Sequence, residues 1–288
     1  MIEASIGLAL LCLIVSGLLD LVLKLYAAKQ RSRGMLIFGI GCVWIALQLA
    51  YMGFTSAEPS FDRTTLTYGI VAAIFVTVSN ILLVECMGHL PISMASTVYR
   101  LNTVPLVIIA FWFLHEDIGS LRVGGIVAGL VTVALLYEPV RTRVTNSPHY
   151  LAFTYLIILA SIVRALYGVA TKGGVNNGGD PNTMMLLAAV GWCIGGLAYA
   201  HFRERRVIIT KDKLKFIPVA GCLVFSVVWL LTTALTMGDA SVIVPIANMG
   251  FVAAFLFSLA LRLELINPRK LSAIVSAAIA IALLTGSA

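Results

Sequence analysis

Charged side chains are scarce in this chain. Asp, Glu, Lys and Arg make up only 11% of its 288 residues, whereas hydrophobic residues make up 60%. This composition lies outside the range of soluble globular proteins and is typical of a protein that crosses a bilayer many times. We therefore expect an all-α integral membrane protein, with residues 1–288 forming a single membrane domain.

The sequence also lacks the motifs that carry enzyme or cofactor chemistry. It has no P-loop, no Gly-x-Ser-x-Gly and no paired-histidine zinc motif. The five cysteines lie inside apolar runs without metal-ligand spacing, which predicts neither a disulfide framework nor a zinc site. We expect no enzyme activity, no cofactor and no metal, and we interpret the glycine-rich residues 173–179 as a flexible external turn.

Ten long apolar runs predict ten transmembrane helices joined by short connections. Each run is close to the roughly 20 residues that a helix needs to cross about 30 Å of hydrocarbon. The first run follows no basic segment and is long enough to span, so we expect no cleavable signal peptide. The predicted spans are 4–26, 35–54, 66–87, 91–114, 120–137, 150–170, 182–201, 214–237, 240–261 and 268–286.

Basic residues are unevenly shared between the two sides of the membrane that the loops would occupy. Fourteen lie on one side and three on the other, which is a strong positive-inside signal. We expect the first side to face the cytoplasm of a bacterial inner membrane, both termini to lie outside, and the net charge of +7 to imply no nucleic-acid partner. The fourteen are Lys29, Arg31, Arg33, Arg141, Arg143, Arg203, Arg205, Arg206, Lys211, Lys213, Lys215, Arg262, Arg269 and Lys270, and the three are Arg63, Arg122 and Lys172.

The chain resembles itself at a separation of about 150 residues. Met87-Gly88 aligns with Met237-Gly238, and, after a slip of two residues, Glu116 aligns with Glu264. Five crossings per repeat end on the side opposite to where they began, so the second repeat must run inverted relative to the first. We predict two inverted five-helix repeats, at about 1–140 and 148–288, with a solute site between them.

Helices four and nine each contain a proline, Pro105 and Pro245. Proline frees backbone carbonyls that neighbours, water or a solute must satisfy, which favours discontinuous helices at a transport site. The alternative is that both prolines only kink their helices for packing.

Stripes of small residues recur at helical spacing, as in Gly125/Gly129 and Gly191/Gly195. Such stripes let helices approach closely in lipid. They indicate packing within the bundle or, as the alternative, a homodimer interface, so the chain is expected to be a monomer or a homodimer.

The sequence resembles the drug/metabolite transporter superfamily, in particular its EamA-type ten-helix members. The resemblance rests on the five-plus-five plan and on the last two helices of each repeat, where a short turn (Gly88–Pro91; Gly238–Ser241) precedes a helix, an acidic residue (Glu116; Glu264) and a last helix rich in small residues. The resemblance implies the transport of small metabolites, amino acids, nucleotide sugars or drugs, by proton coupling or exchange.

Asp20 is the one acidic residue that we predict well inside the first span. It lies four residues before Lys24, which is the favourable order for an ion pair within one helix. A carboxyl group in a low dielectric can exchange a proton near neutral pH, so Asp20 is our candidate for proton coupling.

Two arginines, Arg100 and Arg164, lie deep inside predicted spans. Charge inside a bilayer is expensive and usually marks a solute pathway, and a guanidinium fork fits a carboxylate or phosphate bidentately. The alternative is structural: Arg100 locked onto Asp20, and Arg164 bonded to backbone carbonyls.

We therefore predict a secondary active transporter that moves a small polar metabolite, carrying a carboxylate or phosphate group, across the membrane by alternating access. Its expected partners are this solute and the membrane lipid. Alternatives are a proton-coupled exporter of drugs or toxic compounds, and a non-transporting membrane enzyme or scaffold. Further hydrogen bonds or stacking in the site are expected from Thr77, Thr232 and Thr233. The predicted substrate-binding residues are Arg100, Arg164, Asn80, Tyr167, Trp229 and Asn248.

Overall fold

A computed structural model describes residues 2–27, 33–86, 89–90, 98–116, 119–136, 148–205, 207–261 and 268–286. Several sequence predictions fall outside these described residues. They concern the turn at Met87-Gly88, the acidic residue Glu264, the side chain of Lys24, and the loop cations Lys29, Arg31, Arg141, Arg143, Arg206 and Arg262.

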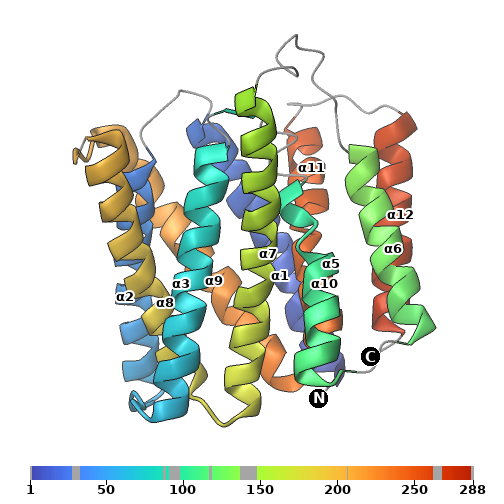
Figure 1. Ribbon diagram of the computed structural model, residues 1–288, viewed down its shortest axis with the longest axis horizontal. Helices are drawn as coiled ribbons and strands as arrows, with labels where there is room; N and C mark the ends of the chain where they lie inside the picture. Colours follow the sequence, from blue (N-terminus) through green and yellow to red (C-terminus); the bar gives the residue numbers. More distant parts are fainter. Residues whose placement is uncertain are drawn as a thin grey trace.

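The described part of the chain is entirely helical (Figure 1). The first half contains α1 (Ile2–Ala27), α2 (Gly34–Phe54), α3 (Arg63–Cys86), α5 (Thr103–Ile109), the π-helical turn η1 (Ala110–Leu114) and α6 (Ser120–Leu136). The second half contains α7 (Pro148–Asn176), α8 (Pro181–Tyr199), the π-helical turn η2 (Ala200–Glu204), α9 (Lys211–Met237), α10 (Ala240–Asn248), α11 (Gly250–Ala260) and α12 (Pro268–Thr285).

Where the structure describes them, the apolar runs are helical, because the bilayer demands that every backbone polar group be satisfied within its own segment. Among the described residues, seven helical segments are long and apolar enough to cross a membrane, and three more (98–114, 120–135 and 271–285) are apolar but shorter. The protein is thus a multi-pass integral membrane protein.

The prediction for residues 173–179 was wrong in part. Helix α7 continues to Asn176, so Gly173 and Gly174 are helical and buried. A Cβ atom on Gly174 would lie 2.5 Å from the terminal methyl of Met184, so the close approach of α8 explains these glycines. The turn itself begins at Asn177, and only Gly178 has a positive φ, +80°.

The packing of the helices relates the two halves of the chain. Helix α1 packs along α9, and α7 packs in the same way along α3. Helix α2 packs against α8, and α6 against α12, the pair seen at one edge of the bundle in Figure 1. The small-residue stripes lie inside these contacts: Gly125 faces Leu284 of α12, and Gly195 faces Thr77 of α3. They therefore pack within the bundle.

Two of the membrane-crossing segments are discontinuous. Helical structure breaks at Leu101–Asn102, just before α5, and again at Met249, between α10 and α11. Pro105 lies in the first turn of α5, where a missing N–H is tolerated, and its ring disfavours helix at the carbonyl of Leu101. Pro245 lies within α10, four residues before the second break. Both proline-containing segments are thus interrupted, although the second break follows Pro245 and does not lie at the carbonyl of Ser241 that its ring disfavours.

The two ends of the bundle differ in charge. We call one of them the basic end: its described cations include Arg33, Arg203, Arg205, Lys211 and Lys215, and it is the upper end in Figure 1. The opposite end contains the start of α1, the end of α12, and the turns that connect α2 to α3 and α7 to α8.

The turns at the opposite end lock together through two helix caps. Asp62 accepts a hydrogen bond from the backbone N–H of Thr65 (2.9 Å), and Asp180 accepts one from that of Thr183 (2.8 Å). The two caps also cross over: the N–H of Ser60 donates to Thr183 Oγ1 at 3.0 Å, and that of Asp180 donates to Thr65 Oγ1 at 2.8 Å. Four backbone donors are satisfied, so this end is rigidly joined.

Candidate functional site

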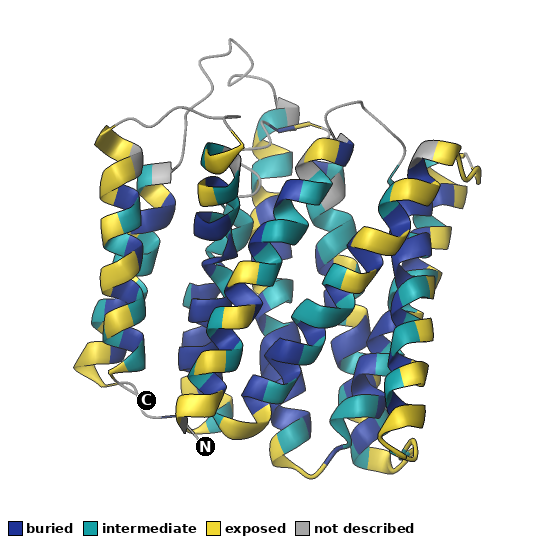
Figure 2. Cartoon of the chain, turned by 180° about the vertical axis from the view of Figure 1, so that it is seen from behind, coloured by how far each residue is buried: buried dark blue, intermediate teal, exposed yellow. Residues whose placement is uncertain are grey.

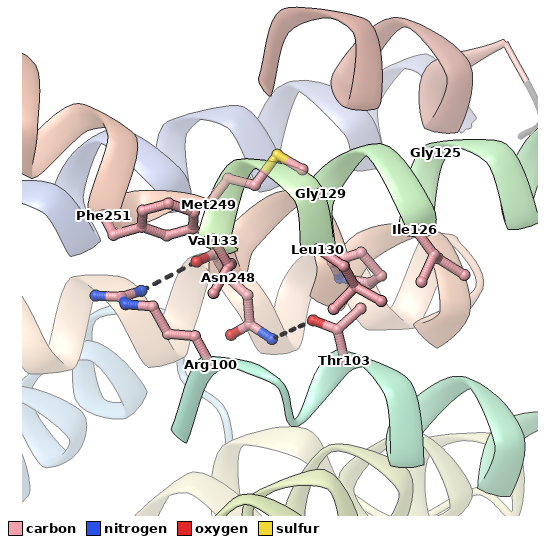
Figure 3. Close-up of a pocket in the computed structure, with 11 residues that line it drawn as sticks. Arg100, Thr103, Gly125, Ile126, Gly129, Leu130, Val133, Asn248, Met249 and Phe251 are labelled. Carbon is pink, nitrogen blue, oxygen red and sulfur yellow. Dashed lines mark hydrogen bonds between the residues drawn. The ribbon is translucent and has the colours of Figure 1, made fainter. Parts of the chain in front are cut away.

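The two helix breaks meet each other inside the bundle (Figure 3). Arg100, just before the first break, donates a hydrogen bond to the carbonyl of Asn248, just before the second, at 3.0 Å. The amide of Asn248 donates in turn to Asn102 Oδ1 at 2.6 Å and to Thr103 Oγ1 at 3.3 Å. The polar groups freed by the breaks therefore satisfy one another.

Asp20 supplies the counter-charge of Arg100. Their side chains form an ion pair between α1 and the first broken segment, and the guanidinium also lies over the ring of Phe251, 5.0 Å from its centroid. The interhelical pair raised as an alternative above is thus present, and the Asp20 carboxylate binds Arg100. Neither side chain is sealed off: Arg100 is 20% exposed and Asp20 35%.

Arg164 is in a different situation. Its guanidinium lies over the ring of Tyr167, whose centroid is 4.9 Å from the guanidinium carbon. Neither a carboxylate nor a backbone carbonyl from the described part of the chain binds it, so the structural alternative of carbonyl bonding does not hold there. Tyr167 itself is buried and 4% exposed.

The partial exposure of Arg164 is toward the inside of the bundle. The lipid-facing stripe of α7 is marked by the exposed side chains of Leu151, Tyr155, Ile158 and Ile162. At about 100° per residue, Arg164 lies about 180° around the helix from Tyr155. Asp20 is likewise about 140° from the exposed stripe of α1 that contains Gly7, Leu11 and Ile14. Both charged side chains therefore lie on the helix faces turned away from the exposed stripes, toward the interior of the bundle.

The two arginines lie at different levels. Arg100 binds Asp20, whereas Arg164 is close enough to Cys12 of the same helix for an electrostatic interaction. Cys12 and Asp20 are separated by eight residues, which is roughly 12 Å along a helix axis. Arg164 is thus nearer the opposite end than Arg100.

The remaining predicted site residues are further from this centre. Asn80 donates its amide to the carbonyl of Val76 in its own helix, at 2.7 Å. Trp229 belongs to an aromatic group in which its ring packs edge-on against Tyr51, with centroids 5.8 Å apart. The hydroxyls of Thr77 and Thr232 are buried without a hydrogen-bond partner among the described residues. The structure thus brings Arg100, Asp20 and Asn248 together, and Arg164 with Tyr167, as two separate groups.

A small cavity of about 20 Å³ lies beside Arg100 and Asn248, between the broken segments and α6. Thr103, Gly129 and Phe251 are among its lining residues (Figure 3). Its volume suits one water molecule. In this conformation the junction of the two breaks is closely packed.

A second charged group, which the sequence did not predict, closes the opposite end. Both Glu116 carboxylate oxygens accept backbone N–H bonds, from Ala240 and Ser241, each at 2.8 Å, and so cap the N-terminus of α10. Lys172 donates to the carbonyls of Leu235 and Gly238, both at 2.8 Å. The group joins the end of the first half to the α9–α10 turn.

Arg122 completes this group by binding Asp239 at 2.7 Å and Ser241 at 3.0 Å. Arg122 and Lys172 had been counted as loop cations, but both lie in helices and are only 9% and 8% exposed. The signal was present in the spacing, because Arg164, Gly168 and Lys172 are four apart and share one face of α7.

Comparison with known proteins bears on this arrangement. The EamA-like transporter family matches residues 153–286. A crystal structure of a protein 14% identical in sequence superposes with a TM-score of 0.80 and covers 97% of this chain and 99% of that chain, which shows a shared fold. No curated protein matches the chain. The match confirms the EamA resemblance noted from the sequence over residues 153–286, and the ten-helix count stays a prediction.

Proposed function

We propose that this EamA-like member of the drug/metabolite transporter superfamily is a secondary transporter for a small polar metabolite that carries a carboxylate or phosphate group. The observation that carries the proposal is Arg164, a permanently charged side chain that faces the interior and meets no carboxylate in the described part of the chain. A cation held in this way inside a membrane is costly unless an anion or water compensates it.

The plan of ten spans in two inverted repeats belongs to the same proposal. In the proposed repeat, α1 corresponds to α7 and α3 to α9, so the contact of α1 with α9 has its counterpart in the contact of α7 with α3. The pairs α2–α8 and α6–α12 each join two corresponding helices. The helix breaks at Leu101 and Met249 are separated by 148 residues, the same interval as Glu116 and Glu264. These relationships support a pathway between the halves that opens alternately to either side.

Arg164 and Arg100 would have unequal roles. Arg164, beside Tyr167, offers a free guanidinium fork for a carboxylate or phosphate. Arg100 is already occupied by Asp20 and by the Asn248 carbonyl, so a solute could bind there only by displacing the carboxylate. Protonation of Asp20 would remove the charge that holds Arg100, so that the guanidinium could bind the anionic group of the solute. Proton binding and solute binding would then be coupled. Asn80, Trp229 and Asn248 are proposed to border the same pathway.

An exporter of aromatic drugs is the second candidate. It is favoured by the aromatic group of Tyr51, Phe225 and Trp229, whose ring centroids are 5.8 to 6.5 Å apart. The Arg100–Asp20 pair leaves no unpaired acid beside it to attract a cationic drug. We therefore favour the anionic metabolite. The family match favours transport over catalysis or scaffolding.

The test begins with a thermal-shift screen of purified protein against carboxylates and phosphates, because a ligand of the native state raises its Tm. For any hit, Arg164→Lys keeps the charge but loses the planar fork, and affinity should fall about tenfold. Arg63→Lys, an exposed arginine at the opposite end, is the matched control and should leave affinity unchanged.

Coupling is tested on the same solute in proteoliposomes. Asp20→Asn should abolish uptake driven by a pH gradient while exchange at equal pH continues. If both Arg164→Lys and Asp20→Asn transport the identified solute like the wild type, the buried charges are structural and the proposal fails.

A further inference from the structure

The segment between η2 and α9, at the basic end, exposes apolar side chains outside any helix. Val207, Ile208 and Ile209 are 50%, 61% and 45% exposed, and Phe202 in η2 is 78% exposed. Three consecutive β-branched apolar residues in a connection to solvent would be unfavourable in water. This surface therefore needs an apolar neighbour.

Phe202 and Val207 border a hollow at the basic end. The chain reverses at Arg205, which has a φ of +49° and donates its N–H to the carbonyl of Ala200. Lys213 then holds the carbonyl of Ile208 at 2.7 Å and fixes the connection against α9. The hollow, of about 390 Å³, is lined by His201, Phe202, Arg205 and Val207.

The charges around the hollow are mainly basic, and one of them, on Arg205, has no carboxylate partner in the described part of the chain. Residues 205–215 contain five basic residues and one acidic residue. Two nearby acids are already engaged, since Glu204 accepts the N–H groups of Arg33 and Gly34, and Glu85 binds Arg203. Arg205 is exposed and has no carboxylate partner in the described part of the chain.

We propose that this hollow binds the headgroup of an anionic phospholipid. Arg205 and His201 would contact the phosphate, while Phe202 and residues 207–209 would lie against the acyl chains. Apolar side chains and cations side by side at a membrane boundary match an anionic lipid in both parts of its structure. The opposite end offers a contrast, because Phe54 and Phe61 are exposed there too but the intervening charges are acidic, Glu58 and then Asp62.

The test compares lipids with the full-length protein in detergent. Phosphatidylglycerol should raise the Tm more than phosphatidylcholine does, and native mass spectrometry should retain phosphatidylglycerol adducts. Arg205→Gln should weaken phosphatidylglycerol affinity about fivefold, whereas Arg205→Lys should restore most of it, because attraction to the headgroup needs charge. Arg63→Gln, an exposed arginine at the opposite end, is the matched control and should bind like the wild type.

Three results would overturn the proposal. They are an equal effect of the two lipids, an unchanged phosphatidylglycerol affinity in Arg205→Gln, and an equal stabilisation by inorganic phosphate alone, which would indicate a site for free anions. If Arg205→Gln folds poorly, Ile208→Ser tests the same proposal by removing an apolar side chain expected to lie against the acyl chains. It should weaken phosphatidylglycerol binding, and unchanged binding would again refute the proposal.

Discussion

Arg100 and Asn248 lie 148 residues apart and meet at the two helix breaks, where the guanidinium binds the main-chain carbonyl at 3.0 Å. This is also the interval between Glu116 and Glu264. Under the proposed repeat, Arg100 and Asn248 occupy equivalent positions in the two halves of the chain. A carbonyl freed by a break in the bilayer must find a donor, and the permanent charge of Arg100 supplies one.

The ion pair of Asp20 and Arg100 should stabilise the fold chiefly because each charge would be costly alone. We expect Arg100→Gln or Asp20→Asn to lower the free energy of unfolding by about 1–3 kcal/mol each, less than for a fully buried pair because both side chains are partly exposed. The double variant should lose clearly less than the sum. Unfolding in mixed micelles, analysed as a double-mutant cycle, measures this, and strict additivity would show that the pair is not coupled.

Much of the fold follows from local properties of the sequence. Apolar runs of membrane length predicted the seven long helical segments, and the prolines marked the two broken segments. The error at residues 173–174 has a simple cause. Glycine is read as a turn signal, but here it lets Met184 and Tyr68 approach α7 closely, and lipid enforces the helix.

Partners of charges were much harder to predict. Asp20 had Lys24 one turn away and Arg100 eighty residues away, and no local rule decides between a helix neighbour and a tertiary one. The contacts of Glu116 and Lys172 with the α9–α10 turn were equally unpredictable, because they connect residues that are far apart in the sequence. One helpful signal was overlooked: Trp44 and Trp192 are also 148 residues apart, and their rings pack edge-on with centroids 5.9 Å apart.

Acid should weaken the interlocked caps at the opposite end. Hydrogen bonds from the Thr65 side chain, the Thr65 backbone and Ser60 lower the pKa of Asp62 to about 2 from an ordinary 3.8. A lowered pKa means that the stabilisation is complete above about pH 4 and is lost as the pH falls through 2. Asp62→Asn should therefore flatten the acid limb of a plot of Tm against pH. Glu58→Gln, a neighbouring exposed carboxylate, should leave the plot unchanged, and so would Asp62→Asn if the caps contributed nothing.

The direction of insertion can be tested with single cysteines in a background without native cysteine. If the basic end faces the cytoplasm, a membrane-impermeant thiol reagent added to intact cells should label Asn176→Cys, at the exposed end of α7, and spare Lys211→Cys, at the start of α9. Both residues are exposed, so both should react after permeabilisation. Exposed residues occur at both ends of the bundle in Figure 2. Labelling of Lys211→Cys alone in intact cells would show the opposite topology.

Glu116 should stabilise the opposite end, because its two oxygens cap α10 and its charge balances that of Lys172. We expect Glu116→Gln to lower the free energy of unfolding by about 1–2 kcal/mol, since the amide keeps one acceptor and loses the other with the charge. Glu58→Gln, the same substitution at an exposed position, should change it by less than about 0.5 kcal/mol.

Lys172 provides the check on the electrostatic part of this prediction. With Glu116 neutral, Lys172 is a buried cation with less counter-charge, so Lys172→Met should cost less stability in the Glu116→Gln background than in the wild type. Equal costs of Lys172→Met in the two backgrounds, measured by unfolding in mixed micelles, would mean that Glu116 acts only as a helix cap. An unaltered stability of Glu116→Gln would contradict the cap as well.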